Sequence, residues 1–198
     1  GGALYASPNP MVGAVIVHDG RIIGEGFHVR RGQAHAEVNA INSVRPEDCA
    51  LLAESTIYVS LEPCAHYGRT PPCAELIVRT GIPRCVVGCQ DPFAKVAGRG
   101  IAILREAGVD VTVGVLEAEC LALNSHFMTA QMQQRPFITL KWAVSADGFI
   151  GRWSDDDALL PQPVALSTPR SLMRVHHLRT LHDAILVGHT TLLSDRPR

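Results

Sequence analysis

The sequence lacks a long apolar run, and it lacks an excess of either charge. It has 18 Lys and Arg residues against 19 Asp and Glu residues, for a formal net charge of −1. Because a basic surplus provides much of the affinity for a polyanion, we expect no nucleic-acid partner. No stretch reaches the roughly 18 apolar residues of a membrane span, and the glycine-rich start lacks the basic and apolar regions of a signal peptide. We therefore expect no membrane association and a cytoplasmic protein.

Cysteine is also sparse, with six residues in a chain of 198. That density is too low for a disulfide scaffold, so we expect thiols that bind metal or lie buried. A hydrophobic content of 46% with 19% charged residues is typical of a globular protein and excludes a disordered one. The length favours one complete domain followed by a small or partial second domain. Because the chain starts without Met and ends abruptly, we expect it to be trimmed at both ends.

The order of apolar segments predicts a layered α/β fold. Residues 11–17 and 22–26 are apolar runs joined by the turn signal Asp19-Gly20, which predicts a β-hairpin. Helix-like and strand-like segments then alternate, with helices expected at 34–44, 72–79, 100–107 and 117–127 and strands at 55–60, 84–88 and 109–115. This order indicates an α/β sandwich that begins with a hairpin.

A polar segment that ends in proline, residues 131–136, is the best position for a linker. We place the first domain at 1–131 and the second at 136–198. The second domain is expected to contain a strand at 137–145, a helix at 169–181 and a strand at 184–188. These elements are the beginning of another α/β unit.

One imidazole, two thiols and a carboxyl form the constellation that carries chemistry. His35, Cys64 and Cys73 offer zinc three protein ligands, which leaves the fourth tetrahedral position open as catalytic zinc sites do. Zinc lowers the pKa of a bound water to about 7, so hydroxide becomes available near neutrality. Glu37 lies two residues from His35 and can move the proton. His-x-Glu followed by Pro-Cys is a signature of zinc deaminases, in which the glutamate is an acid/base and not a ligand.

The local context of the cysteines separates ligands from core residues. Cys73 follows two prolines at an expected helix start, where the helix dipole favours a thiolate by about 0.3–1 kcal/mol. Any one of the three ligands alone is more often an ordinary polar or core residue, but the joint pattern favours a metal site. Cys85 and Cys89 flank an apolar strand and are expected to be buried thiols. Cys49 and Cys120 receive no role.

Five motifs of the chain resemble those of the bifunctional deaminase–reductase family of riboflavin biosynthesis. They are Ser7-Pro-Asn-Pro-Met-Val-Gly13, His35-Ala-Glu-Val38, the segment from Leu61 to Cys73, Gln90-Asp-Pro92 and Val96-Ala-Gly-Arg-Gly100. Eight residues separate the two cysteine ligands here, whereas two do so in the generic deaminase motif. The resemblance implies a cytidine-deaminase-like three-layer α/β/α sandwich, followed by the start of a dihydrofolate-reductase-like domain. We also expect a homo-oligomer.

The resemblance further implies a small-molecule substrate, 2,5-diamino-6-ribosylamino-4(3H)-pyrimidinone 5′-phosphate. It assigns zinc ligation to His35, Cys64 and Cys73 and proton transfer to Glu37. Asn9 resembles the amide that reads the pyrimidine edge, which needs both a donor and an acceptor. The remaining substrate contacts implied are His66, Arg69 and Asp91, and the guanidinium of Arg69 suits a phosphate because it binds bidentately. The chain departs from the family at Phe93, where many members have Asn.

The second domain resembles the reductase half of the same family, which uses NADPH to reduce the ribose of the deaminated product. The likeness runs through residues 139–148 and 184–191. It implies NADPH contacts at Ala143, Ala165, Thr191 and Asp195, and a substrate phosphate contact at Arg179. Two departures are a Pro-Val-Ala stretch at 163–165, where members carry an indole ring, and the lack of the glycine-rich dinucleotide loop. We therefore expect an incomplete NADPH site.

Two other interpretations of the sequence stay open. A zinc deaminase of another base, such as tRNA adenosine or cytosine, shares the ligand pattern, although the neutral charge and the long gap between the cysteines disfavour it. A non-enzymatic, zinc-stabilised binding module would need a fourth protein ligand and would tolerate replacement of Glu37. His66 is the one residue near the motif that the sequence leaves available for that fourth position.

Overall fold

The computed structural model describes residues 5–68, 71–93, 96–151 and 164–195. The chain divides into two compact units, Gly1–Phe137 and Ile138–Arg198, and each is described by itself. None of the described helices combines the length and the apolar composition that crossing a bilayer requires.

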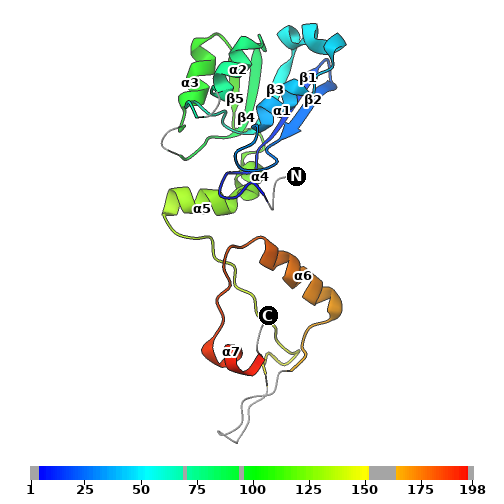
Figure 1. The fold of residues 1–198 in the computed structure, drawn as a ribbon, viewed down its shortest axis with the longest axis vertical. Helices are drawn as coiled ribbons and strands as arrows, with labels where there is room; N and C mark the ends of the chain where they lie inside the picture. The colour runs from blue at the N-terminus through cyan, green and yellow to red at the C-terminus, as the bar shows by residue number, and fades with distance from the viewer. Residues whose placement is uncertain (1–4, 69–70, 94–95, 152–163, 196–198) are drawn as a thin grey trace, which may run out of the picture. The chain divides into compact units, whose positions relative to one another are not determined.

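A five-stranded mixed sheet organises the first unit (Figure 1). Its strands are β1 (Gly13–His18), β2 (Arg21–Phe27), β3 (Thr56–Leu61), β4 (Arg84–Cys89) and β5 (Asp110–Val113), in the spatial order β2-β1-β3-β4-β5. Strand β1 is antiparallel to both β2 and β3, whereas β3, β4 and β5 run parallel. The predicted hairpin is confirmed, and both turn residues, Asp19 and Gly20, have the positive φ that a type I′ turn requires.

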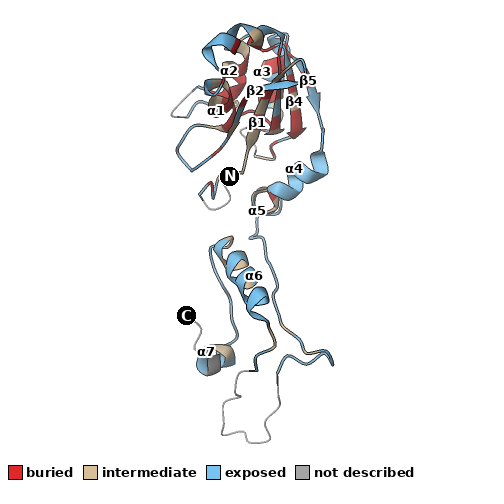
Figure 2. Ribbon diagram, turned by 90° about the vertical axis from the view of Figure 1, so that its right-hand side faces the viewer, coloured by how far each residue is buried: buried red, intermediate tan, exposed pale blue. Residues whose placement is uncertain are grey.

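Three helices cover one face of this sheet: α1 (Ala36–Asn42), α2 (Cys73–Arg79) and α3 (Arg99–Glu106). Alternate residues of β1, β3 and β4 pack against them, so the core lies between helices and sheet (Figure 2). Gly26 of β2 permits the close approach of α1, because a Cβ atom there would lie 2.4 Å from the Ala40 nitrogen. The predicted layered α/β arrangement of this unit is confirmed.

The helix predicted at 117–127 is broken into two, α4 (Glu117–Leu123) and α5 (Ser125–Gln133). Asn124 lies at the break, where its Oδ1 accepts from the Met11 N–H at 2.7 Å and its Nδ2 donates to the Met11 carbonyl at 2.9 Å. Asparagine side chains readily bond to backbone groups, and these bonds to Met11 compete with continuation of the helix through Asn124. A 3₁₀ helix at Pro46–Glu54, η2, was not among the predicted elements.

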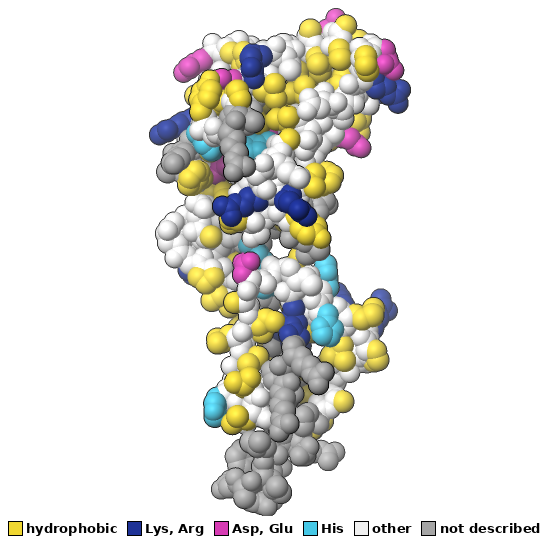
Figure 3. Space-filling view, viewed as in Figure 1, with side chains coloured by type: hydrophobic (Ala, Val, Ile, Leu, Met, Phe, Trp, Pro, Cys, Tyr) yellow, Lys and Arg dark blue, Asp and Glu magenta, His cyan; other side chains and the backbone are white. Residues whose placement is uncertain are grey.

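The second unit contains α6 (Pro169–Thr180) and α7 (His189–Asp195). The predicted helix at 169–181 is confirmed, and Thr168 caps it by accepting a hydrogen bond from the Ser171 N–H at 3.2 Å. The strands predicted at 137–145 and 184–188 are wrong for this chain, because the described residues provide them with no partner strand. No described residue of this unit is buried, and its apolar side chains stand on the surface (Figure 3).

The boundary between the domains stays a prediction. Helix α5 continues to Gln133, so the segment expected as a linker begins inside a helix. The division by contacts falls between Phe137 and Ile138.

Candidate zinc and substrate site

The three expected zinc ligands come from three different elements of the first unit. His35 is the residue before α1, Cys64 follows the end of β3, and Cys73 is the first residue of α2. The Cys73 N–H donates to the Cys64 sulfur at 3.2 Å, and the Ala74 N–H donates to the Cys64 carbonyl at 3.2 Å. The start of α2 therefore holds Cys64 against Cys73.

The spacing of the ligand atoms fits a tetrahedral zinc ion. His35 Nδ1 lies 3.5 Å from the sulfur of Cys64 and 3.4 Å from that of Cys73. Zinc with bonds of about 2.3 Å to sulfur and about 2.0–2.1 Å to nitrogen holds these two atom types roughly 3.6 Å apart. Within the described part of the chain, no fourth His, Cys, Asp or Glu joins the group, and His66 is not a member. Three ligands leave one tetrahedral position open.

The pKa values of the two cysteine thiols are shifted in opposite directions. The hydrogen bond from Cys73 lowers the pKa of Cys64 to about 4, and the same interaction raises the pKa of Cys73. A hydrogen bond to Cys64 likewise raises the pKa of His35 above its usual value. Zinc requires both thiolates and a neutral imidazole, so binding of the metal releases protons.

Glu37 is the second residue of α1 and is only 3% exposed. Burial raises the pKa of its carboxyl to about 7, against the opposing effects of nearby hydrogen bonds and of His35. Its side chain lines the same cavity as His35 and Cys64. A carboxyl that titrates near neutrality can both accept and return a proton at physiological pH.

A cavity of about 360 Å³ opens beside the ligands, which is within the size range of small-molecule sites. It collects most of the predicted deaminase residues, namely Asn9, His35, Glu37, Cys64, His66 and Asp91. Phe93, the departure from the family pattern, also lines it, and its N–H donates to Asp91 Oδ1 at 2.8 Å. Burial raises the pKa of Asp91. Arg69 lies outside the described residues.

His28 is a cavity residue that sequence reasoning missed. It is 4% exposed, and its ring meets that of His35 edge to face with centroids 5.5 Å apart. Its Nδ1 lies 3.1 Å from the Ala34 carbonyl, which can only accept, so Nδ1 carries the proton. Its Nε2 therefore accepts from the Asn9 Nδ2 at 3.2 Å. This bond fixes the orientation of the amide, so Asn9 Oδ1 stays available to accept a hydrogen bond from a ligand. In the sequence, only the position of His28 after an expected strand hinted at a role.

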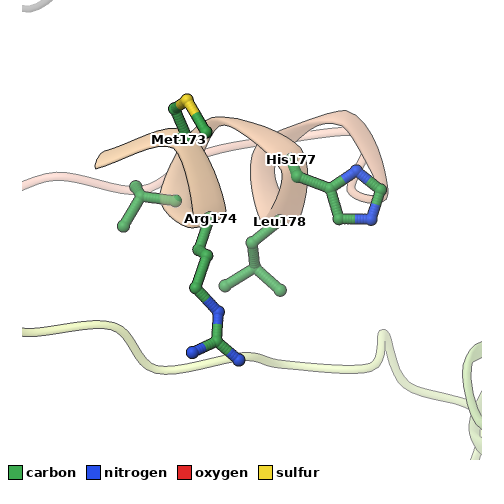
Figure 4. Close-up of a pocket in the computed structure, with 5 residues that line it drawn as sticks. Met173, Arg174, His177 and Leu178 are labelled. Atoms are coloured by element: carbon green, nitrogen blue, oxygen red, sulfur yellow. The ribbon is translucent and has the colours of Figure 1, made fainter. Parts of the chain in front are cut away.

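The predicted reductase contacts lie in the second unit, on separate elements. Arg179 is half-buried on α6 and Thr191 half-buried on α7, Ala143 is half-buried, Ala165 is exposed, and the side chain of Asp195 is outside the described part. A hollow over α6 is lined by Met173, Arg174, Val175, His177 and Leu178 (Figure 4). It includes none of the predicted contact residues.

Comparison with known proteins supports the interpretation of both units. Residues 2–89 match the cytidine and deoxycytidylate deaminase zinc-binding region, and residues 136–198 match the RibD C-terminal domain. Fold and site thus define a zinc-binding deaminase region of the cytidine and deoxycytidylate deaminase class, in which His35, Cys64 and Cys73 form the zinc triad. The chain belongs to the RibD deaminase/reductase family of riboflavin biosynthesis.

Individual relatives resemble most or nearly all of the chain. The RibD protein of Aquifex aeolicus is 42% identical over 193 residues, which cover 98% of this chain and 51% of the relative. The chloroplastic riboflavin biosynthesis protein PYRD of Zea mays is 50% identical over 147 residues, which cover 74% of this chain and 36% of the relative. The solved deaminase/reductase of Thermotoga maritima is 42% identical with a TM-score of 0.87, covering 99% of this chain and 54% of that one.

The comparisons confirm the predicted fold class, a cytidine-deaminase-like domain followed by the start of the reductase domain. The chain spans about half the length of the curated RibD relatives that it matches.

Proposed function

We propose that the first unit is a zinc-dependent hydrolytic deaminase acting on 2,5-diamino-6-ribosylamino-4(3H)-pyrimidinone 5′-phosphate. The observation that carries the proposal is the convergence of three chemistries on one cavity. These are a zinc triad with an open fourth position, a buried carboxyl and an amide fixed by a histidine. The membership in the RibD family supports the choice of substrate.

Each protein group has a distinct task in this proposal. When bound by His35, Cys64 and Cys73, zinc supplies the activation of a water nucleophile. Glu37 takes one proton from water and delivers it to the ring nitrogen, and it then takes the second proton from the hydroxyl added to the ring carbon and delivers it to the amine, which leaves as ammonia. Its burial and its pKa of about 7 suit both directions of transfer.

Substrate selection rests on the polar groups around the cavity. Asn9 offers the pyrimidine edge its free Oδ1 and its second amide hydrogen, since His28 occupies the first. His66 and Asp91 line the cavity where the ribose and phosphate are proposed to lie. Arg69 is proposed to bind the 5′-phosphate through its planar fork. A small pyrimidine nucleotide is thus the proposed partner of this unit.

The second unit is proposed to be the N-terminal part of an NADPH-dependent reductase. The match to the RibD C-terminal domain supports this assignment. The contacts proposed above for NADPH and for the substrate phosphate require the remainder of that domain. The homo-oligomeric state and the cytoplasmic location stay predictions, and one plant relative is described as chloroplastic.

A substrate panel tests the proposal against its alternatives. The zinc-loaded chain is incubated with the diaminopyrimidine nucleotide, with cytidine and dCMP, and with a tRNA anticodon stem, and ammonia release is measured. We expect ammonia from the diaminopyrimidine nucleotide at a rate at least about a hundredfold above the others. A faster reaction with cytidine, dCMP or tRNA would establish a deaminase of another base. Bound zinc without ammonia from any substrate would establish a binding module.

A further inference from the structure

Glu62 is a buried carboxylate that neither the predicted site nor the proposed reaction uses. It stands directly before Pro63 and Cys64 and is 4% exposed. Its two oxygens accept four backbone N–H groups, whose donors are Gly100 at 3.0 Å and Ile101 at 3.3 Å on Oε1, and Gly98 at 2.9 Å and Asp91 at 3.3 Å on Oε2. A carboxylate has about four acceptor positions, so this one is fully used.

The four donors belong to segments that would otherwise be separate. Asp91 begins the segment that carries Phe93 and Val96 on the cavity wall, and the other three donors surround the start of α3. Gly100 lets the start of α3 approach the segment between β3 and Cys64, because a Cβ atom there would lie 1.9 Å from the Pro63 carbonyl oxygen. Negative charge at a helix start is also favoured by the helix dipole. Glu62 thus joins the segment that leads from β3 to Cys64 to the segment of the cavity wall that begins at Asp91.

The zinc ligand itself has other anchors. Cys64 is held by the Cys73 and Ala74 N–H groups of α2 and follows a strand that pairs with β1 and β4. Asp91 also follows a paired strand, β4, but beyond the end of that strand its backbone N–H donates to Glu62. Loss of the Glu62 acceptors is therefore expected to displace the wall at Asp91 and leave the metal ligands in place.

We propose that Glu62 is a positioning residue for the substrate: its carboxylate fixes the wall that carries Asp91, Phe93 and Val96 at a set distance from the zinc ligands. The inference rests on the proposed deaminase function and deepens it, because it names the one side chain that holds the substrate-binding wall in position. In the proposed function Asp91 lies on the ribose and phosphate side of the nucleotide, so displacement of this wall is expected to weaken binding more than chemistry.

Glu62→Gln is the sharpest variant, since it keeps the size of the side chain and replaces one acceptor oxygen by an NH₂ group. That NH₂ group faces two backbone donors, so two hydrogen bonds are lost and the donors are pushed apart. We expect unchanged zinc content, a KM for the nucleotide raised about tenfold or more, and a kcat within about threefold of the parent value. Glu62→Asp keeps both oxygens but is shorter by one methylene. We expect its KM to lie between that of the parent and that of Glu62→Gln.

Glu106→Gln is the matched control, because it makes the same substitution at an exposed residue on the other end of α3. The experiment measures zinc content, circular dichroism, KM and kcat for the full chain and the three variants. An unchanged KM in Glu62→Gln, or a loss confined to kcat, would overturn the inference. Failure of both Glu62 variants to hold zinc would also overturn it, since the residue would then serve the fold. A parent chain that releases no ammonia would refute the proposed function instead.

Discussion

The junction between α4 and α5 offers a quantitative test of the packing described above. Asn124 is 3% exposed, and its amide makes both hydrogen bonds available to the Met11 backbone, across a separation of 113 residues. Each bond contributes about 0.5–1.5 kcal/mol, and a buried group left without a partner costs about 1–3 kcal/mol. Asn124→Ala removes both bonds from the half-buried Met11, and two bonds at about 0.5–1.5 kcal/mol each predict a loss of about 1–3 kcal/mol in the free energy of unfolding.

Urea unfolding of the full chain, followed by far-UV circular dichroism, measures this loss. Tryptophan fluorescence does not report on the first unit, because both tryptophans, Trp142 and Trp153, lie after Phe137. Asn42→Ala is the matched control, an exposed asparagine at the end of α1, and we expect a change within about 0.5 kcal/mol. A loss below about 0.5 kcal/mol in Asn124→Ala would refute the argument that these two hydrogen bonds hold Met11 at the junction between α4 and α5.

Three further outcomes follow from the zinc triad, from the proposed role of Arg69 and from the domain assignment. Cys64→Ser is expected to lose zinc, which the parent holds at about one ion per chain, and to be less stable, whereas the exposed Cys49→Ser should keep it; elemental analysis decides. Removal of the 5′-phosphate should raise KM about tenfold or more, and Arg69→Ala should abolish that difference; equal rates with both substrates would remove Arg69 from its role. The chain should consume no NADPH with the deaminated product, because the described residues after Phe137 include no buried residue.

The metal site was predictable because its chemistry restricts both residue type and spacing. Zinc requires particular donor atoms, and the deaminase reaction requires a carboxyl close to them. The hairpin was predictable as well, since the Asp19-Gly20 turn and the apolar runs are local signals. His35, Cys64 and Cys73 then meet as the pattern predicted.

The features that were missed depend on contacts between distant segments. The helix at 117–127 has local helical spacing, but Asn124 bonds to Met11 and divides it. His28 lies in none of the motifs, Glu62 lies in the Leu61–Cys73 motif without an assigned role, and only the folded chain shows the partners of both. The strands expected at 137–145 and 184–188 have suitable apolar runs, but a strand needs a neighbour that the described residues do not provide.

The central claim is that Glu37 carries the proton in a zinc-dependent deamination, and Glu37→Gln tests it most directly. The amide keeps the size of the buried side chain but cannot shuttle a proton, so zinc content and circular dichroism should match the parent. The measurement is the rate of ammonia release from the diaminopyrimidine nucleotide at saturating substrate. We expect a decrease of at least about a hundredfold, the usual contribution of a general acid/base. An undiminished rate in the zinc-loaded variant would contradict the account.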